Sequence, residues 1–126
     1  MNTLNTNKLR LRFRGLFGHE SEFYCGNGWF KLIWSLGEDL EVLAKEAGLH
    51  PAKDFSVIEV KEKLGGLRFY IDKTISKAMN DRIQQAKEES IVTCDICSAP
   101  ALCRKHADGV IATRCGEHTY SIGTDL

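Results

Sequence analysis

The stretch Cys94-Asp-Ile-Cys97, followed after 17 residues by Cys115-Gly-Glu-His118, contains two pairs of metal-binding side chains at one spacing. Two residues between ligands let one tight turn present both side chains to the same ion, and two such turns complete a tetrahedral site. Residues 101–105 and 110–114 between them are strand-like, and Asp108-Gly109 is typical of a turn. The pattern predicts a zinc ribbon with one structural Zn²⁺ per chain, held by Cys94, Cys97, Cys115 and His118.

A third pair, Cys103-Arg-Lys-His106, has the same spacing and offers alternative ligands. A site made of Cys94, Cys97, Cys103 and His106 would leave only five residues between the pairs, which is short for a hairpin. We therefore favour the outer pairing, with Cys103 in mid-strand and His106 beside the turn. Catalytic zinc sites normally keep an open position, so four protein ligands predict a structural ion.

The composition is that of an ordinary globular protein. The 126 residues are 43% hydrophobic and 27% charged, and 17 basic side chains balance 17 acidic ones. This balance argues against a dedicated DNA-coating protein. No segment approaches the roughly 20 apolar residues that span a bilayer, and residues 1–7 lack the apolar region of a signal peptide. We expect a cytoplasmic protein that makes no membrane contact. Thiols stay reduced in the cytoplasm, so paired cysteines there are expected to bind metal rather than form disulfides.

Residues 8–14 read Lys-Leu-Arg-Leu-Arg-Phe-Arg, in which basic and apolar side chains alternate. Period 2 predicts a half-buried strand whose apolar side chains, Leu9, Leu11 and Phe13, face inward. The outward side chains form a candidate basic patch: Lys8, Arg10, Arg12 and Arg14. We favour an edge strand protected by charge, and a nucleic-acid contact is the alternative. Residues 15–28 contain many turn formers and are interpreted as a loop.

Residues 29–47 have the apolar period of a helix, with Asn27 as its predicted cap and Gly48 at its end. The predicted stripe is Trp29, Leu32, Ile33, Leu36, Leu40, Leu43 and Ala47. Residues 55–64 and 67–72 predict two strands joined by a tight turn at Gly65-Gly66. A second helix is expected over 74–90, capped by Asp72 or Thr74, with its own stripe of Ile75, Met79, Ile83 and Ala86.

These elements together predict an α+β protein with a small antiparallel sheet covered by two helices. Residues 1–93 would form the α+β core, containing the basic strand, a helix, the hairpin and the second helix. Residues 94–126 would form the zinc ribbon and a tail.

Two further stretches, Cys25-Gly-Asn-Gly-Trp-Phe-Lys-Leu-Ile and Lys61-Glu-Lys-Leu-Gly-Gly-Leu-Arg-Phe-Tyr70, occur in this order before the cysteine pairs. In this order they resemble a group of small, mostly uncharacterised proteins encoded by phages and prophages. That group has a Gly-Trp helix start, a similar hairpin, a helix and a Cys-x-x-Cys…Cys-x-x-His ending. The resemblance covers roughly residues 23–118 and implies a mobile-element protein in the cytoplasm of a bacterial host cell.

We expect a non-catalytic protein that binds a host protein, for example an inhibitor of a bacterial defence system such as an anti-CRISPR protein. The alternative is a zinc-ribbon module that binds nucleic acid or has a regulatory role, although we do not expect specific nucleic-acid binding. A third hypothesis is a metal-dependent enzyme such as a nuclease, using Glu59 and Glu62 with Lys61 or Lys63. Glu59 and Glu62 are expected on opposite strand faces, which makes them a poor carboxylate pair.

Overall fold

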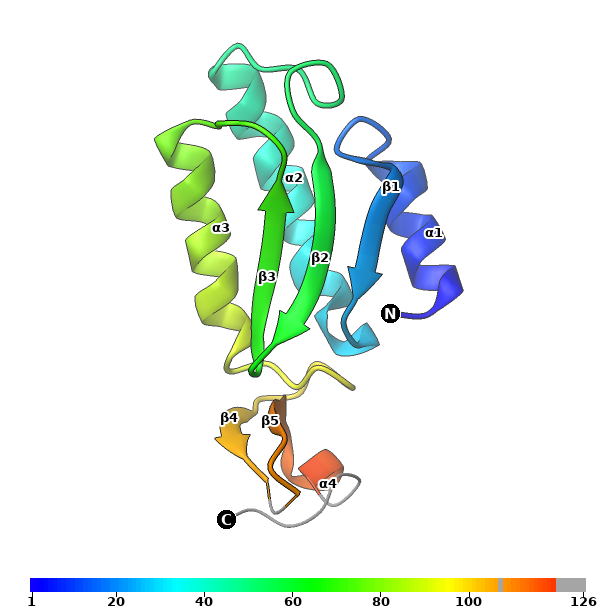
Figure 1. Cartoon of the computed structure of the whole chain (residues 1–126), viewed down its shortest axis with the longest axis vertical. Coiled ribbons are helices and arrows are strands. Elements are labelled where there is room, and N and C mark those ends of the chain that lie inside the picture. The colour runs from blue at the N-terminus through cyan, green and yellow to red at the C-terminus, as the bar shows by residue number, and fades with distance from the viewer. Residues whose placement is uncertain (107, 120–126) are drawn as a thin grey trace.

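The computed structural model describes residues 1–106 and 108–119, and the predicted tail at 120–126 lies outside the described residues. The predicted α+β class is confirmed, with a sheet and helices above a separate two-stranded ribbon (Figure 1). In chain order the elements are α1 (Thr3–Arg12), β1 (Phe17–Tyr24), η1 (Asn27–Trp29), α2 (Phe30–Glu46), β2 (Val57–Lys63), β3 (Gly66–Ile71), α3 (Lys77–Ser90), β4 (Leu102–Lys105), β5 (Ile111–Arg114) and α4 (Gly116–Thr119).

The main sheet is mixed rather than purely antiparallel, which corrects the prediction. Its strand order is β1-β2-β3, with β1 parallel to β2 and β2 antiparallel to β3. The reason is that α2 carries the chain back along the sheet between β1 and β2, so β2 repeats the direction of β1. In Figure 1, α2 lies behind the strands, and α1 and α3 flank it.

Residues 8–12 belong to a helix, so the strand predicted over 8–14 is wrong. Asn2 caps α1 through its side chain, which accepts a 2.8 Å hydrogen bond from the Asn5 amide. Leu9 and Phe13 are fully buried, whereas Leu11 is 64% exposed. Leu9 and Phe13 are four residues apart. This spacing places two side chains on the same face of either a strand or a helix, because it equals two strand periods and about one helical turn. Only the exposure of Leu11 separates the two structures.

The loop predicted over residues 15–28 contains strand β1, which is a second correction. Phe17 and Ser21 are buried, and the Ser21 hydroxyl donates to the carbonyl of Val57 on β2. The pairing with β2 shifts in register between Phe17 and Glu22. This irregularity removes the simple apolar alternation by which a strand is recognised in sequence.

Helix α2 ends as predicted, because Gly48 has a φ of +72° just beyond it. Its buried stripe includes Ala44 in place of Ala47, which is exposed. The predicted cap Asn27 makes no capping bond and lies in η1. Its side-chain oxygen instead accepts hydrogen bonds from Asn2 and Asn5, which joins the start of α1 to this turn.

The β2–β3 hairpin is present, but its turn lies one residue earlier than predicted. Leu64 and Gly65 occupy the turn, with φ values of +53° and +84°. A register shift between Val57 and Glu59 also disrupts the regular side-chain alternation of β2. Val57 and Val60 are both buried as a result, and Ile58 is 45% exposed.

Helix α3 buries Met79, Ile83 and Ala86, as predicted. Its cap is Ser76, whose hydroxyl accepts from the Met79 amide at 3.2 Å. Neither Asp72 nor Thr74 serves as the cap. Asp72 instead accepts a 2.8 Å hydrogen bond from the Ser56 amide, across the open end of the hairpin.

Candidate metal centre

Four side chains converge at the end of the ribbon: Cys94, Cys97, Cys115 and His118. One donor atom from each lies within 4.8 Å of all the others. The Cys97 and Cys115 sulfurs are 3.6 Å apart, and the His118 Nδ1 lies 3.6 Å from the Cys94 sulfur and 3.1 Å from the Cys115 sulfur. Tetrahedral zinc geometry places two sulfurs about 3.8 Å apart and a sulfur and nitrogen about 3.6 Å apart. The donors therefore fit one four-coordinate metal ion.

Two tight turns hold these donors. In the first turn, the Cys94 amide donates to the Ala99 carbonyl at 2.8 Å, and the Ser98 amide donates to the Cys94 carbonyl at 3.0 Å. In the second, Cys115 follows β5, and the His118 amide of α4 donates to its carbonyl at 3.0 Å. Each turn presents two side chains on the same side, as the spacing predicts.

The alternative ligands do not join this cluster. Cys103 lies in the middle of β4 and is exposed, with its sulfur 3.5 Å from the Leu64 carbonyl oxygen. His106 is fully buried beside the turn between β4 and β5. The outer pairs are therefore the ones whose donor atoms converge.

Electrostatics favour metal binding at Cys115. Burial opposes ionisation of this thiol, but hydrogen bonds from the side chain and backbone of His118 outweigh it and lower its pKa to about 6. The thiolate is the form of cysteine that binds metal. Cys115 therefore reaches the ligating form near neutral pH.

The first turn of the ribbon packs against the segment Cys25–Trp29 of the core. The Gly28 amide donates to the Asp95 carbonyl at 3.0 Å, and the Ser98 hydroxyl donates to the Gly28 carbonyl at 2.5 Å. A Cβ on Gly28 would lie 2.1 Å from the Cys94 carbonyl oxygen, so only glycine fits this contact. The indole N–H of the fully buried Trp29 donates to the Thr93 carbonyl at 2.9 Å.

This docking site was not predicted from the sequence. Its only signal was the pair of glycines that flank Asn27, at positions 26 and 28.

The ribbon makes a second contact with the tip of the β2–β3 hairpin. The buried Thr113 hydroxyl of β5 donates to the Gly65 carbonyl at 2.6 Å. Within the ribbon, the Arg114 guanidinium lies 2.6 Å from the Asp95 carboxylate, and both side chains are largely buried. This ion pair connects the two metal-binding turns to each other.

The predicted basic patch lies on α1 and the turn that follows it, and two of its side chains are held within the protein. Arg10 donates to the Ser21 carbonyl and lies over the Phe23 ring. Arg12 forms a 3.0 Å ion pair with Glu41 of α2. Lys8 and Arg14 are exposed. The C-terminal end of α1 lies at the end of the sheet away from the ribbon (Figure 1).

The candidate carboxylates of the enzyme hypothesis are separated as the strand period predicts. Glu59 forms a 3.2 Å ion pair with Lys61, whereas Glu62 accepts a 2.6 Å hydrogen bond from the Gly65 amide. Among residues 1–106 and 108–119, the cluster of metal-binding side chains is the Cys₃His group alone.

Comparison of the chain with protein-family models, curated proteins and solved structures finds no match. In the described part of the chain, no helix combines the length and the apolar character needed to cross a membrane.

Proposed function

We propose that this is a non-catalytic, zinc-stabilised protein that acts by binding another protein. The observation that carries the proposal is the Cys₃His cluster, whose four donors fill a tetrahedral shell. Two or more thiolates with histidine are typical of structural zinc, and a shell with four protein ligands leaves no position for a substrate. When bound, zinc would supply the folding free energy of a ribbon that has few buried apolar side chains.

The charge distribution supports a protein partner rather than a nucleic acid. Phosphate binding needs several basic side chains that converge on one track. Arg10 and Arg12 already have intramolecular partners, and their helix end lies away from the ribbon (Figure 1). Tyr24 and Tyr70, in contrast, are 57% and 41% exposed on the two outer strands of the sheet. Tyrosine is enriched in protein interfaces.

The resemblance to phage- and prophage-encoded proteins suggests the setting of this activity. On that basis we place the partner in the cytoplasm of a bacterial host cell, where a component of a defence system is a concrete target. An anti-CRISPR role is one version of this proposal. The sequence resemblance supports this role, and the geometry of the site supports the stabilised scaffold.

A binding experiment separates this proposal from the nucleic-acid alternative. DNA and RNA are titrated at about 150 mM salt, where non-specific binding has dissociation constants of roughly 10⁻⁴ to 10⁻⁶ M. In parallel, the tagged protein captures its partners from cells of the source organism after nuclease treatment. We expect weak nucleic-acid binding and nuclease-resistant capture of a protein. A nanomolar affinity for DNA or RNA that Arg10→Ala and Arg12→Ala abolish would support the alternative.

A further inference from the structure

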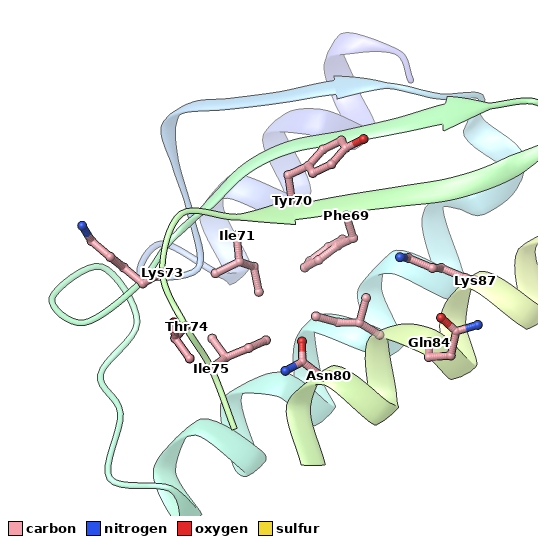
Figure 2. Close-up of a pocket in the computed structure, with 10 residues that line it drawn as sticks. Phe69, Tyr70, Ile71, Lys73, Thr74, Ile75, Asn80, Gln84 and Lys87 are labelled. Atoms are coloured by element: carbon pink, nitrogen blue, oxygen red, sulfur yellow. The ribbon is translucent and has the colours of Figure 1, made fainter. Parts of the chain in front are cut away.

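A groove of about 450 Å³ lies between strand β3 and helix α3. Figure 2 shows Phe69 and Ile71 reaching from the strand toward the helix. Asn80, Gln84 and Lys87 line the opposite side from α3, at the spacing of one helical stripe. The groove therefore has an apolar wall from the strand and a polar rim from the helix.

The strand side of this groove is a sheet edge, because β3 is the outermost strand in the order β1-β2-β3. Two hydrogen bonds fix which backbone groups face outward. The Leu67 amide points away from β2 and donates to the Ser90 hydroxyl at 2.9 Å, whereas the Asp72 amide points toward β2 and donates to the Ser56 carbonyl at 3.2 Å. Backbone direction alternates along a strand, so the N–H and C=O groups of Phe69 and Ile71 face outward.

This edge can accept another strand over a defined length. The Leu67 amide is already bonded to Ser90, which limits pairing at one end of β3. The strand ends at Ile71, which limits it at the other. Phe69 and Ile71 together offer two donors and two acceptors at the spacing of an extended chain. An extended backbone is the ligand geometry that matches these groups.

The charges around the groove specify the side chains of that ligand. Among the described residues that line it, Lys73 and Lys87 are the charged ones and none is acidic. Lys73 lies near one end and Lys87 near the other (Figure 2). Lys77, at the start of α3, is already paired with Asp81 at 2.7 Å. An approaching chain therefore meets positive charge at both ends of an apolar wall.

We propose that the groove between β3 and α3 binds an extended, acidic peptide segment of the partner protein, which adds to β3 as a new edge strand. The inference rests on the proposed protein-binding function and assigns it a site. Alternate side chains of the segment contact the apolar wall, and its carboxylates lie near Lys73 and Lys87. In strand addition, backbone hydrogen bonds contribute affinity and the alternate side chains contribute specificity.

The test uses the full-length, metal-loaded protein and a fluorescein-labelled peptide Glu-Thr-Val-Thr-Val-Thr-Glu, of about seven residues, the length of an ordinary strand. Successive side chains of a strand point to opposite faces, so this sequence places its Val side chains and its two terminal Glu side chains together on the face toward the groove. A matched peptide replaces Glu with Lys. Fluorescence polarisation measures affinity, and amide chemical shifts in NMR spectra report the binding site. We expect the Glu peptide to bind more tightly than the Lys peptide, with the largest shifts at the amides of Phe69 and Ile71.

Charge reversal tests the specificity. Exposed charge pairs change affinity by a few-fold each, so Lys73→Glu and Lys87→Glu should each weaken binding of the Glu peptide about threefold. The Lys73→Glu/Lys87→Glu double variant should bind the Lys peptide more tightly than the Glu peptide. Such a reversal of preference could not result from a loss of folding. Lys8→Glu, at an exposed position of α1 beside the opposite edge strand β1, is the matched control and should leave the preference unchanged.

Backbone pairing is tested with Ile71→Pro. The outward Ile71 amide makes no ladder bond with β2, so proline at this edge position removes a donor for the ligand while preserving the sheet. Ile71→Val, which keeps the amide, controls for the side chain. We expect at least a tenfold loss for proline and little change for valine.

The groove proposal would be overturned if the Glu peptide did not bind at concentrations up to about 1 mM. Equal affinity for the Glu and Lys peptides would also overturn it. So would amide chemical-shift changes that lie outside β3 and α3. Capture of the partner protein is repeated with the Lys73→Glu/Lys87→Glu variant. Undiminished capture would reject the groove and leave the proposed protein-binding function standing. If the unaltered protein captured no protein partner at all, that result would instead count against the protein-binding function.

Discussion

The Thr113 hydroxyl donates a 2.6 Å hydrogen bond to the carbonyl of Gly65, and this bond joins the ribbon to the tip of the core hairpin. The bond is buried, so losing either partner would leave an unsatisfied polar group. A second interface between the core and the ribbon is formed by the contacts of Gly28 and Trp29 with the segment of the first metal-binding turn. Stability of the metal centre should therefore affect the core.

Metal removal should destabilise the core as well as the ribbon. We expect close to one zinc ion per chain by elemental analysis, because four donors converge at one point. Chelation should lower the melting temperature of the whole protein and shift the indole signal of Trp29, whose N–H is bonded to Thr93 beside Cys94. Two ions per chain, or a chelated protein with unchanged melting and Trp29 signals, would contradict this.

Two cysteine variants test the ligand assignment. Cys115→Ser removes a donor of the cluster and should abolish stoichiometric zinc binding and unfold the ribbon. Cys103→Ser should keep one zinc ion, because the Cys103 sulfur is exposed and lies beside the Leu64 carbonyl, outside the cluster of donors. Zinc content and far-UV circular dichroism measure both effects. Metal loss in the Cys103 variant with retention in the Cys115 variant would establish the permuted site.

Glycine variants test how closely the hairpin tip approaches the ribbon. Gly65 has a φ of +84°, and a Cβ there would lie 2.4 Å from the Cys103 sulfur and 3.2 Å from the Thr113 hydroxyl. Gly65→Ala should destabilise the protein by about 1–3 kcal/mol through backbone strain, with a steric contribution added. Urea denaturation measures the change.

The adjacent Gly66→Ala is the matched control. A Cβ on Gly66 would meet the Ile91 side chain at an ordinary 3.5 Å, and its φ is not positive. Its cost should be under about 1 kcal/mol. In the Gly65→Ala background, Cys103→Ala should recover part of the loss by removing the sulfur. Equal costs at the two glycines would contradict the close approach.

The convergence of the four donor atoms could be predicted from the sequence because ligand spacing is a local property. Cys94 and Cys97 share one turn, Cys115 and His118 another, and the strands between them are short. Helix α2 and the hairpin were also predictable from apolar periodicity and from Gly48 and Gly65. In each case residues near one another in the chain decide the structure.

The errors arose where distant contacts decide the structure. Leu9 and Phe13 fit a strand or a helix equally well, and only burial against the rest of the core selects the helix. β1 forms by parallel pairing with β2, which α2 separates from it in the chain. The docking of Gly28 against Cys94 likewise joins segments more than 60 residues apart. Periodicity and turn residues carry no information about such contacts.

Thiol reactivity gives the last prediction. Burial is the main reason that the pKa of the Cys25 thiol rises to about 12, so at pH 8 only about one molecule in ten thousand carries the reactive thiolate. Cys103 is exposed in β4. Iodoacetamide should therefore alkylate Cys103 in the native, metal-loaded protein and leave Cys25 unmodified, as read by peptide mass spectrometry. Denaturation should make Cys25 reactive, and Cys103→Ser should remove native labelling. Rapid native labelling of Cys25 would contradict the burial of this thiol in the core.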